Sequence, residues 1–196
     1  MLGPHDSAYK AIGRYVVLFS AIVANMRNLL ATRIAGQEDD ERDLVEFAFG
    51  ALTAEPITNA FFAACRTLAK LDADERAIEA CLRKAVLDEI KRRNDLLHGD
   101  WSVDEFGSDG PRAMLTRVKA GSVKEPFRFN EYTAEQIEEM CVEVDALRKS
   151  IFMFAHVTLQ PHGEGAYEWA PSRVRDAFEI VDRRVVLRPG VAYPHG

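Results

Sequence analysis

The stretch Arg93-Asn94-Asp95-Leu96-Leu97-His98-Gly99-Asp100-Trp101 marks the point where a helical sequence pattern ends and a strand-like pattern begins. A strongly charged helical pattern precedes it, and apolar and polar residues alternate after Trp101. Gly99 can end the helix in a left-handed cap, because glycine has no Cβ to oppose that conformation. The stretch also gathers an arginine, an amide and an imidazole within two helical turns. No other part of the chain has a comparable cluster of polar chemistry, so the functional prediction rests on it.

Upstream of this stretch, the spacing of apolar residues predicts three helical segments. The first runs from Asp6 or Ser7 to about Ala35 and has one broad apolar face. The second covers about 43–71 and is divided near Gly50 and Pro56, because an interior proline removes a backbone hydrogen bond. The acidic run 37–43 is predicted to be a solvated connection. Four aromatic residues of the second segment are expected in the core: Phe47, Phe49, Phe61 and Phe62.

The third segment begins at Asp72 or Asp74 and ends near His98. Glu89 and Arg93 lie four residues apart on its apolar face, with the acid nearer the N-terminus. This is the favourable order for an ion pair, and charged side chains are rarely buried without a partner. We therefore expect Glu89 to hold Arg93 in place.

Downstream, the helical period disappears between residues 101 and 130, where turn residues separate short alternating runs. We expect a small antiparallel hairpin or three-stranded sheet there. Thr133 and Gln136 then fit a capping box, and the long helix they open ends at Pro161. A short helix near 172–181 and a strand over 183–188 are predicted in the tail. The fold class is therefore mainly α, with a small antiparallel β element before the last long helix.

Size and charge limit the classes of function. The 196 residues carry 25 basic and 31 acidic side chains, for a net charge of −6. Proteins that coat nucleic acids in general rely on many lysines and arginines, so this balance argues against that class. Three widely spaced cysteines are typical of reduced, buried thiols in the cytoplasm. The apolar run 15–24 is too short to span a bilayer, and we expect a soluble cytoplasmic protein with no membrane association.

Arg93, Asn94 and His98 together suit one kind of chemistry. Histidine can take or give a proton near neutral pH, and arginine offers a planar fork of donors to phosphate oxygens. Asparagine can orient an imidazole or donate to a developing oxyanion. RNA supplies its own nucleophile, the 2′-hydroxyl, so these groups could cleave a phosphodiester without a metal. The structural alternative is that His98 only caps the helix and Arg93 only pairs with Glu89.

The Arg93-Asn94-x-x-x-His98 pattern resembles the hallmark of the HEPN (higher eukaryotes and prokaryotes nucleotide-binding) superfamily. The resemblance covers about residues 6–160. It implies an up-and-down helical bundle that forms a homodimer, with two motifs facing one cleft. For active members it implies metal-independent endoribonuclease activity that leaves a cyclic phosphate. Many members are toxins or defence proteins held by a regulatory partner protein.

The resulting hypothesis is an HEPN-like bundle over 1–160, with a β insertion at about 101–130 and a C-terminal extension over 161–196 packed on the same domain. Arg93, Asn94 and His98 are the predicted catalytic residues of a metal-independent endoribonuclease, and Glu89 is the supporting residue. No cofactor or metal ion is expected. The alternative is a catalytically inactive module that binds nucleotides or dimerises.

Overall fold

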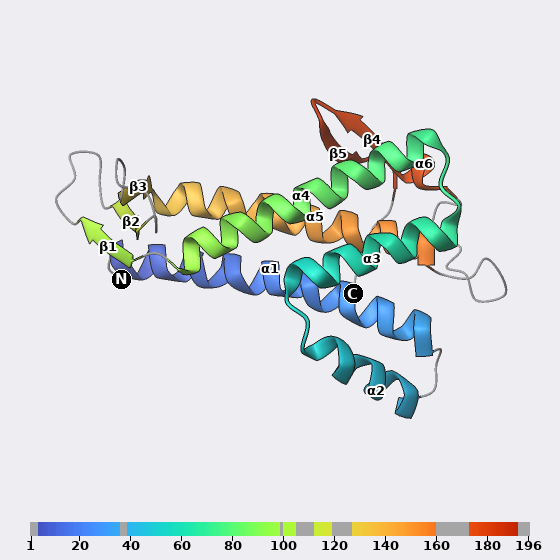
Figure 1. Cartoon of the computed structure of the whole chain (residues 1–196). Coiled ribbons are helices and arrows are strands. Elements are labelled where there is room, and N and C mark those ends of the chain that lie inside the picture. Colours follow the sequence, from blue (N-terminus) through green and yellow to red (C-terminus); the bar gives the residue numbers. More distant parts are fainter. Residues whose placement is uncertain are drawn as a thin grey trace. The chain divides into compact units, whose positions relative to one another are not determined.

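The computed structural model describes residues 4–35, 39–98, 100–104, 112–118, 127–159 and 173–191. Within them the protein is mainly α-helical, and an antiparallel three-stranded sheet precedes the last long helix, as predicted (Figure 1). The helices are α1 (Pro4–Ala35), α2 (Asp39–Gly50), α3 (Ala54–Ala69), α4 (Ala73–Leu97), α5 (Ala134–Leu159) and α6 (Val174–Ala177). The strands are β1 (Asp100–Asp104), β2 (Arg112–Val118), β3 (Phe127–Tyr132), β4 (Phe178–Val181) and β5 (Arg184–Leu187).

The chain divides into two compact units, and each is made of segments that are distant in sequence. The first unit combines residues 1–19 with 89–145, and the second combines 20–88 with 146–196. The helices α1, α4 and α5 each contribute residues to both units. The predicted domain boundary near residue 160 lies outside the described residues, so the division into 1–160 and 161–196 stays a prediction.

In the second unit, α2 differs from the sequence prediction in two ways. It begins at Asp39, so residues 39–43 form its first turn rather than a connection. Acidic residues are favourable there because they face the positive end of the helix dipole. Phe47 was predicted to be buried but is 84% exposed, whereas Phe49 is half-buried. Residues two apart leave a helix in different directions, so Phe47 and Phe49 cannot both face the core.

The core of the second unit is aromatic, as predicted for α3. Phe61 and Phe62 are buried, and their rings meet edge to face with centroids 5.2 Å apart. The ring centroid of Phe62 also lies 5.8 Å from that of Phe154 on α5. The helix α2 ends at Gly50, and the next helix, α3, has Thr53 at its N-cap position. Pro56 therefore lies in the first turn of α3, where a missing N–H costs little.

The start of α4 is fixed by a reciprocal capping arrangement. The Glu75 backbone N–H donates to Asp72 Oδ1 at 3.0 Å, and the Asp72 N–H donates to Glu75 Oε2 at 3.1 Å. Glu75 is buried, and both of its carboxylate oxygens also accept hydrogen bonds from Arg173, at 2.8 and 2.6 Å. The Arg173 guanidinium beside Glu75 lowers the pKa of that carboxyl to about 2. One carboxylate thus caps α4 and holds the C-terminal segment against it.

We expect Glu75→Gln to lower the free energy of unfolding at pH 7 by about 1–2 kcal/mol, because a charge-assisted pair becomes a neutral one. The pKa of Glu75 is lower in the folded state than in the unfolded chain. Its contribution is therefore complete above the unfolded pKa and is lost as pH falls toward about 2. Urea unfolding at pH 7 and pH 3 measures this difference. Glu55→Gln, an exposed change in the first turn of α3, is the control. An equal loss of stability at both pH values would contradict the assignment.

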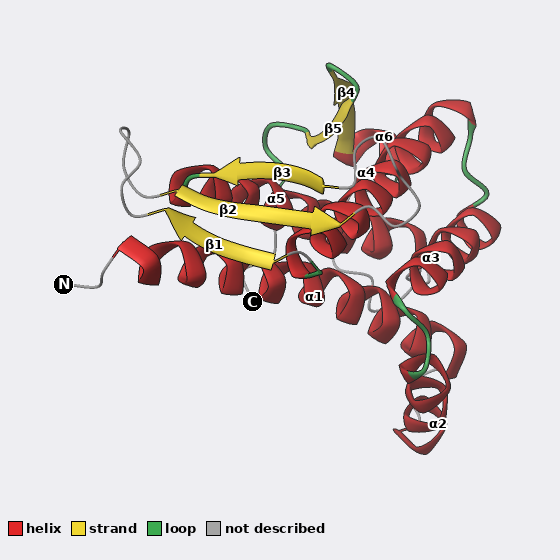
Figure 2. Ribbon diagram, turned by 60° about the vertical axis from the view of Figure 1, so that its left-hand side comes forward, coloured by secondary structure: helices red, strands yellow, loops and turns green. Residues whose placement is uncertain are grey.

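In the first unit, the β segment and the start of α5 follow the sequence prediction. The strands β1, β2 and β3 form an antiparallel sheet with β2 in the centre (Figure 2). In this sheet Trp101 pairs with Leu115, which is buried. The predicted capping box is present, because the Gln136 N–H donates to Thr133 Oγ1 at 3.2 Å and the Thr133 N–H donates to Gln136 Oε1 at 2.9 Å.

The C-terminal segment was predicted to be helical over 172–181, and this was only partly right. The helix α6 is a single turn, and residues 178–181 form β4. An antiparallel hairpin joins β4 to β5. Asp182 and Arg183 form its turn, with φ angles of 49° and 64°. A two-residue turn with both φ values positive matches the twist of the two strands, so the hairpin replaces the predicted helical continuation.

The helix α1 has the single apolar face that its sequence predicts. Its buried residues recur at three and four and include Ala11, Tyr15, Phe19, Ile22 and Met26. Residues Ser7–Ala35 are also long and apolar enough to cross a membrane, and about a third of the most apolar window is buried. Buried helices of soluble proteins and signal sequences meet the same test. The cytoplasmic location therefore stays a prediction.

Candidate functional site

The three predicted catalytic residues lie in the last two turns of α4 and in the residue that follows it. Arg93 and Asn94 are half-buried, and His98 is exposed. The His98 backbone N–H donates to the Asn94 carbonyl oxygen at 3.0 Å. This bond continues the helical pattern, so Asn94 and His98 lie one turn apart on the same side of the helix. Gly99, the predicted left-handed cap, lies outside the described residues.

Arg93 turns toward Asn94, as its long side chain allows. Its Nη1 donates to Asn94 Oδ1 at 3.1 Å. Arg93 Nε is buried and has no hydrogen-bond partner among the described residues. A buried donor of this kind is costly unless it is satisfied. The guanidinium is thus held by an amide while part of its donor capacity remains unused.

Glu89 does not pair with Arg93, and the sequence prediction of this ion pair was wrong. The Glu89 carboxylate accepts a hydrogen bond from the Tyr15 hydroxyl at 2.7 Å and forms an ion pair with Arg92 at 2.9 Å. Arg92 Nη1 also lies 3.0 Å from an oxygen of Glu143 on α5. Glu89 therefore joins α1, α4 and α5 within the first unit.

This network is built from buried groups. Tyr15 is fully buried and Glu89 is 8% exposed. Burial raises the pKa of the Tyr15 hydroxyl, and the hydrogen bond to Glu89 raises it further. Tyr15 thus remains a neutral donor at physiological pH. Neither Tyr15 nor Arg92 was predicted from the sequence to belong to this network. The spacing of Glu89 and Arg92, three residues apart on a helix, could have identified Arg92, but Tyr15 is 74 residues away in sequence.

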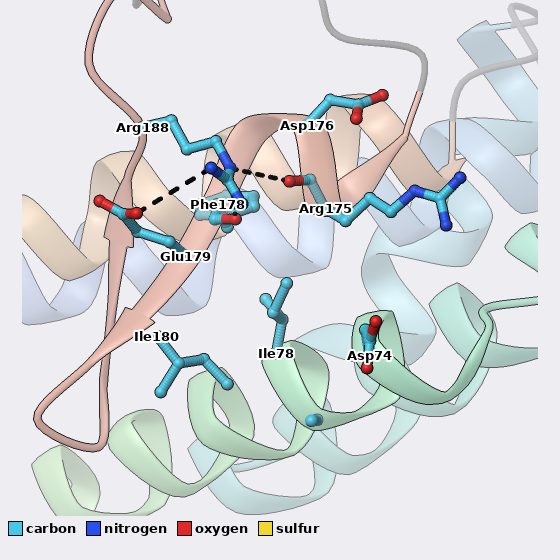
Figure 3. A pocket seen from close by; sticks show the side chains of 9 residues that line it. Asp74, Ile78, Arg175, Asp176, Phe178, Glu179, Ile180 and Arg188 are labelled. Carbon is cyan, nitrogen blue, oxygen red and sulfur yellow. Dashed lines mark hydrogen bonds and ion pairs between the residues drawn. The ribbon is translucent and has the colours of Figure 1, made fainter.

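A separate pocket of about 690 Å³ lies in the second unit, between the start of α4 and the β4–β5 hairpin (Figure 3). Ile78, Phe178 and Ile180 line its apolar part. Arg188 Nε donates to the carbonyl oxygens of Arg175 and Phe178, at 2.9 and 3.0 Å. The described residues of the lining include no imidazole, hydroxyl or thiol. We therefore regard this pocket as the seam where the hairpin packs, and the candidate site remains at the end of α4.

The cysteines do not form a second candidate site. All three are free; Cys65 and Cys141 are buried, and Cys81 is half-buried. Burial raises the pKa of Cys65 to about 12, which leaves this thiol protonated and a poor nucleophile. Burial likewise raises the pKa of Cys141. In the parts of the chain that the structure describes, no three His, Cys, Asp or Glu side chains form a cluster that could hold a metal ion.

Comparison of the chain with models of protein families, with curated proteins and with solved structures gives no significant match.

Proposed function

We propose that the protein is an HEPN-like, metal-independent endoribonuclease whose active site contains Arg93, Asn94 and His98. The observation that carries the proposal is the state of the Arg93 guanidinium. It is fixed to Asn94 and has a buried Nε that finds no hydrogen-bond acceptor in the described part of the chain, and the exposed imidazole of His98 follows one turn after Asn94. An arginine held in this way is suited to bind a phosphate group, because its remaining donors form a planar fork.

The proposed reaction needs a proton acceptor and a proton donor. The RNA 2′-oxygen attacks the adjacent phosphorus, and His98 takes the 2′-hydroxyl proton as the new O–P bond forms. The bond from phosphorus to the 5′-oxygen breaks, and this oxygen receives a proton from the imidazolium of a second motif. The products are a 2′,3′-cyclic phosphate and a 5′-hydroxyl. The second motif comes from a second copy of the chain, so homodimerisation is part of the proposal.

An acidic protein is a poor general binder of RNA. A site with one arginine and one histidine on a chain of net charge −6 suits a specific RNA better than bulk RNA. A role as a toxin or defence protein, controlled by a regulatory partner, belongs to the same proposal. An inactive protein that binds nucleotides is the alternative, and it differs in having no cleavage product.

The direct test is incubation of a mixed RNA pool with the purified protein in EDTA, followed by analysis of the new RNA ends. Cyclic phosphate ends are expected. An RNA from the pool that is found to be cleaved is then synthesised with 2′-O-methyl groups. This form should not be cleaved, because its 2′-oxygen can no longer act as the nucleophile. Absence of cleavage in EDTA, or equal cleavage of the 2′-O-methyl RNA, would refute the proposed chemistry.

We expect Arg93→Lys to reduce the cleavage rate on the order of tenfold, because lysine keeps the charge but cannot present two parallel donors. The melting temperature should change little, since Arg93 is half-buried and its hydrogen bond is to the side chain of the adjacent Asn94. Arg76→Lys, at an exposed position of the same helix, provides the matched control. Unchanged cleavage by Arg93→Lys would exclude a bidentate phosphate contact.

A further inference from the structure

The helix α2 carries an apolar face that its own unit leaves exposed. Leu44 is 70% exposed and Phe47 is 84% exposed, and Ala48 is exposed on the same side. These three positions follow the spacing i, i+3 and i+4, which is the spacing of contact residues when a helix binds in a groove. Figures 1 and 2 both show α2 at the periphery of its unit.

A different side of α2 faces the protein. Val45 and Phe49 are one turn apart and half-buried, and on a helical wheel they lie well away from Leu44 and Phe47. This side accounts for the attachment of α2 to its own unit. The exposed apolar face is therefore additional to the face that folding requires. An exposed phenylalanine next to an exposed leucine is typical of interaction surfaces.

Acidic residues flank the exposed face. Glu41 and Asp43 are exposed, and their positions on the wheel lie on either side of the row formed by Leu44, Ala48 and Phe47. The sequence of α2 contains five acidic residues and one basic residue, which gives the helix a net charge of −4. This charge disfavours binding to another copy of α2, to anionic lipid or to nucleic acid, because like charges repel.

We propose that α2 is a docking helix for a partner protein whose apolar groove is bordered by lysine or arginine side chains. Leu44 and Phe47 enter the groove, and Glu41 and Asp43 meet its basic border. The partner is not needed for the chemistry at the end of α4, so this proposal does not depend on the proposed ribonuclease activity.

Two synthetic amphipathic helical peptides serve as probes, one with leucines flanked by lysines and the other with the same leucines flanked by glutamates. In isothermal titration calorimetry, the 196-residue protein should bind the lysine peptide and not the glutamate peptide. The double variant Leu44→Ser/Phe47→Ser should bind the lysine peptide at least about tenfold more weakly, because two apolar contacts are lost while the charge is unchanged. The control Val142→Ser, at a 66% exposed position on α5, should bind as the wild type does.

Equal binding of both peptides, or equal binding by the double variant, would overturn the proposal. The remaining alternative is that the exposed face of α2 binds a second copy of this chain. Analytical ultracentrifugation tests it by measuring the oligomeric state. If the wild type is a dimer and the double variant a monomer, the face belongs to a homodimer and the proposal is wrong. The double variant should keep its circular dichroism spectrum, since both side chains are exposed, and should cleave RNA as the wild type does. If neither the wild type nor the double variant cleaves RNA, the proposed ribonuclease activity is refuted. The result of the peptide-binding experiment is unaffected by that outcome.

Discussion

Replacing His98 by alanine is expected to reduce RNA cleavage in EDTA by about 10²- to 10⁴-fold, the usual contribution of general acid–base catalysis. In the proposed reaction His98 takes the 2′-hydroxyl proton, whereas Arg93 binds the phosphate and Asn94 holds Arg93. The loss should appear in the rate of a single turnover with excess enzyme. Binding of an uncleavable 2′-O-methyl RNA should change little, since Arg93 still contacts the phosphate.

The matched control is Leu97→Ala, a change at the neighbouring position, which is 36% exposed. It should leave cleavage within about twofold of the wild type, because it removes no acid, base or phosphate donor. The melting temperature of His98→Ala should equal that of the wild type, since His98 is exposed. Equal rates for His98→Ala and the wild type would exclude His98 as the proton acceptor.

Glu89→Ala is expected to lower the free energy of unfolding by about 2–4 kcal/mol. The substitution leaves the fully buried Tyr15 hydroxyl of α1 without its acceptor on α4, and it removes the carboxylate with which Arg92 forms an ion pair within α4. The effect is measured by urea unfolding at pH 7. At low temperature, where the variant is still folded, cleavage should persist, because Glu89 hydrogen-bonds with Tyr15 and forms an ion pair with Arg92, neither of which is a proposed catalytic residue.

Glu143→Ala removes the other carboxylate that pairs with Arg92, but this side chain is 45% exposed. Its cost should stay below about 1 kcal/mol, as for other solvent-exposed ion pairs. Tyr15→Phe completes a double-mutant cycle with Glu89→Ala, and the two losses should not add, since both variants break the same hydrogen bond. Additive losses, or a Glu89→Ala variant as stable as Glu143→Ala, would show that the buried network contributes little.

Local signals in the sequence predicted the ends of several elements. Thr133 and Gln136 form the capping box that their spacing indicates, and Asp72 begins α4 through a similar exchange with Glu75. Such contacts span three residues, so the sequence contains them in full. The three-stranded sheet was also predicted, because turn residues separate its alternating runs.

Errors arose where the pairing or packing of one segment with another decides the structure. Residues 178–181 continue a plausible helix, yet they pair with 184–187 and form a strand. Strand formation depends on the neighbouring strand more than on local preference. Phe47 was assigned to the core because it is aromatic, but only the packing of α2 determines which of its sides is covered.

At the candidate site the sequence places Arg93, Asn94 and His98 within two helical turns, and the structure adds the hydrogen bond from Arg93 to Asn94. The sequence prediction failed for Glu89, since two arginines lie within reach of that carboxylate and helical spacing alone does not choose between them. The Glu89 carboxylate is also held by the hydroxyl of Tyr15, which comes from α1 and is far away in the sequence. Whether a second motif completes the site depends on contacts between two copies, which a single sequence does not contain.

Each of the two units combines segments of the chain that are synthesised at different times. The first 19 residues belong with residues 89–145, and residues 20–88 belong with 146–196. Neither group can assemble from a continuous stretch as the chain leaves the ribosome. The start of α4 acquires its Arg173 contacts only after 98 further residues follow Glu75. We therefore expect the helices of residues 1–88 to remain partly unpacked until residues 89–196, which complete both units, have been synthesised.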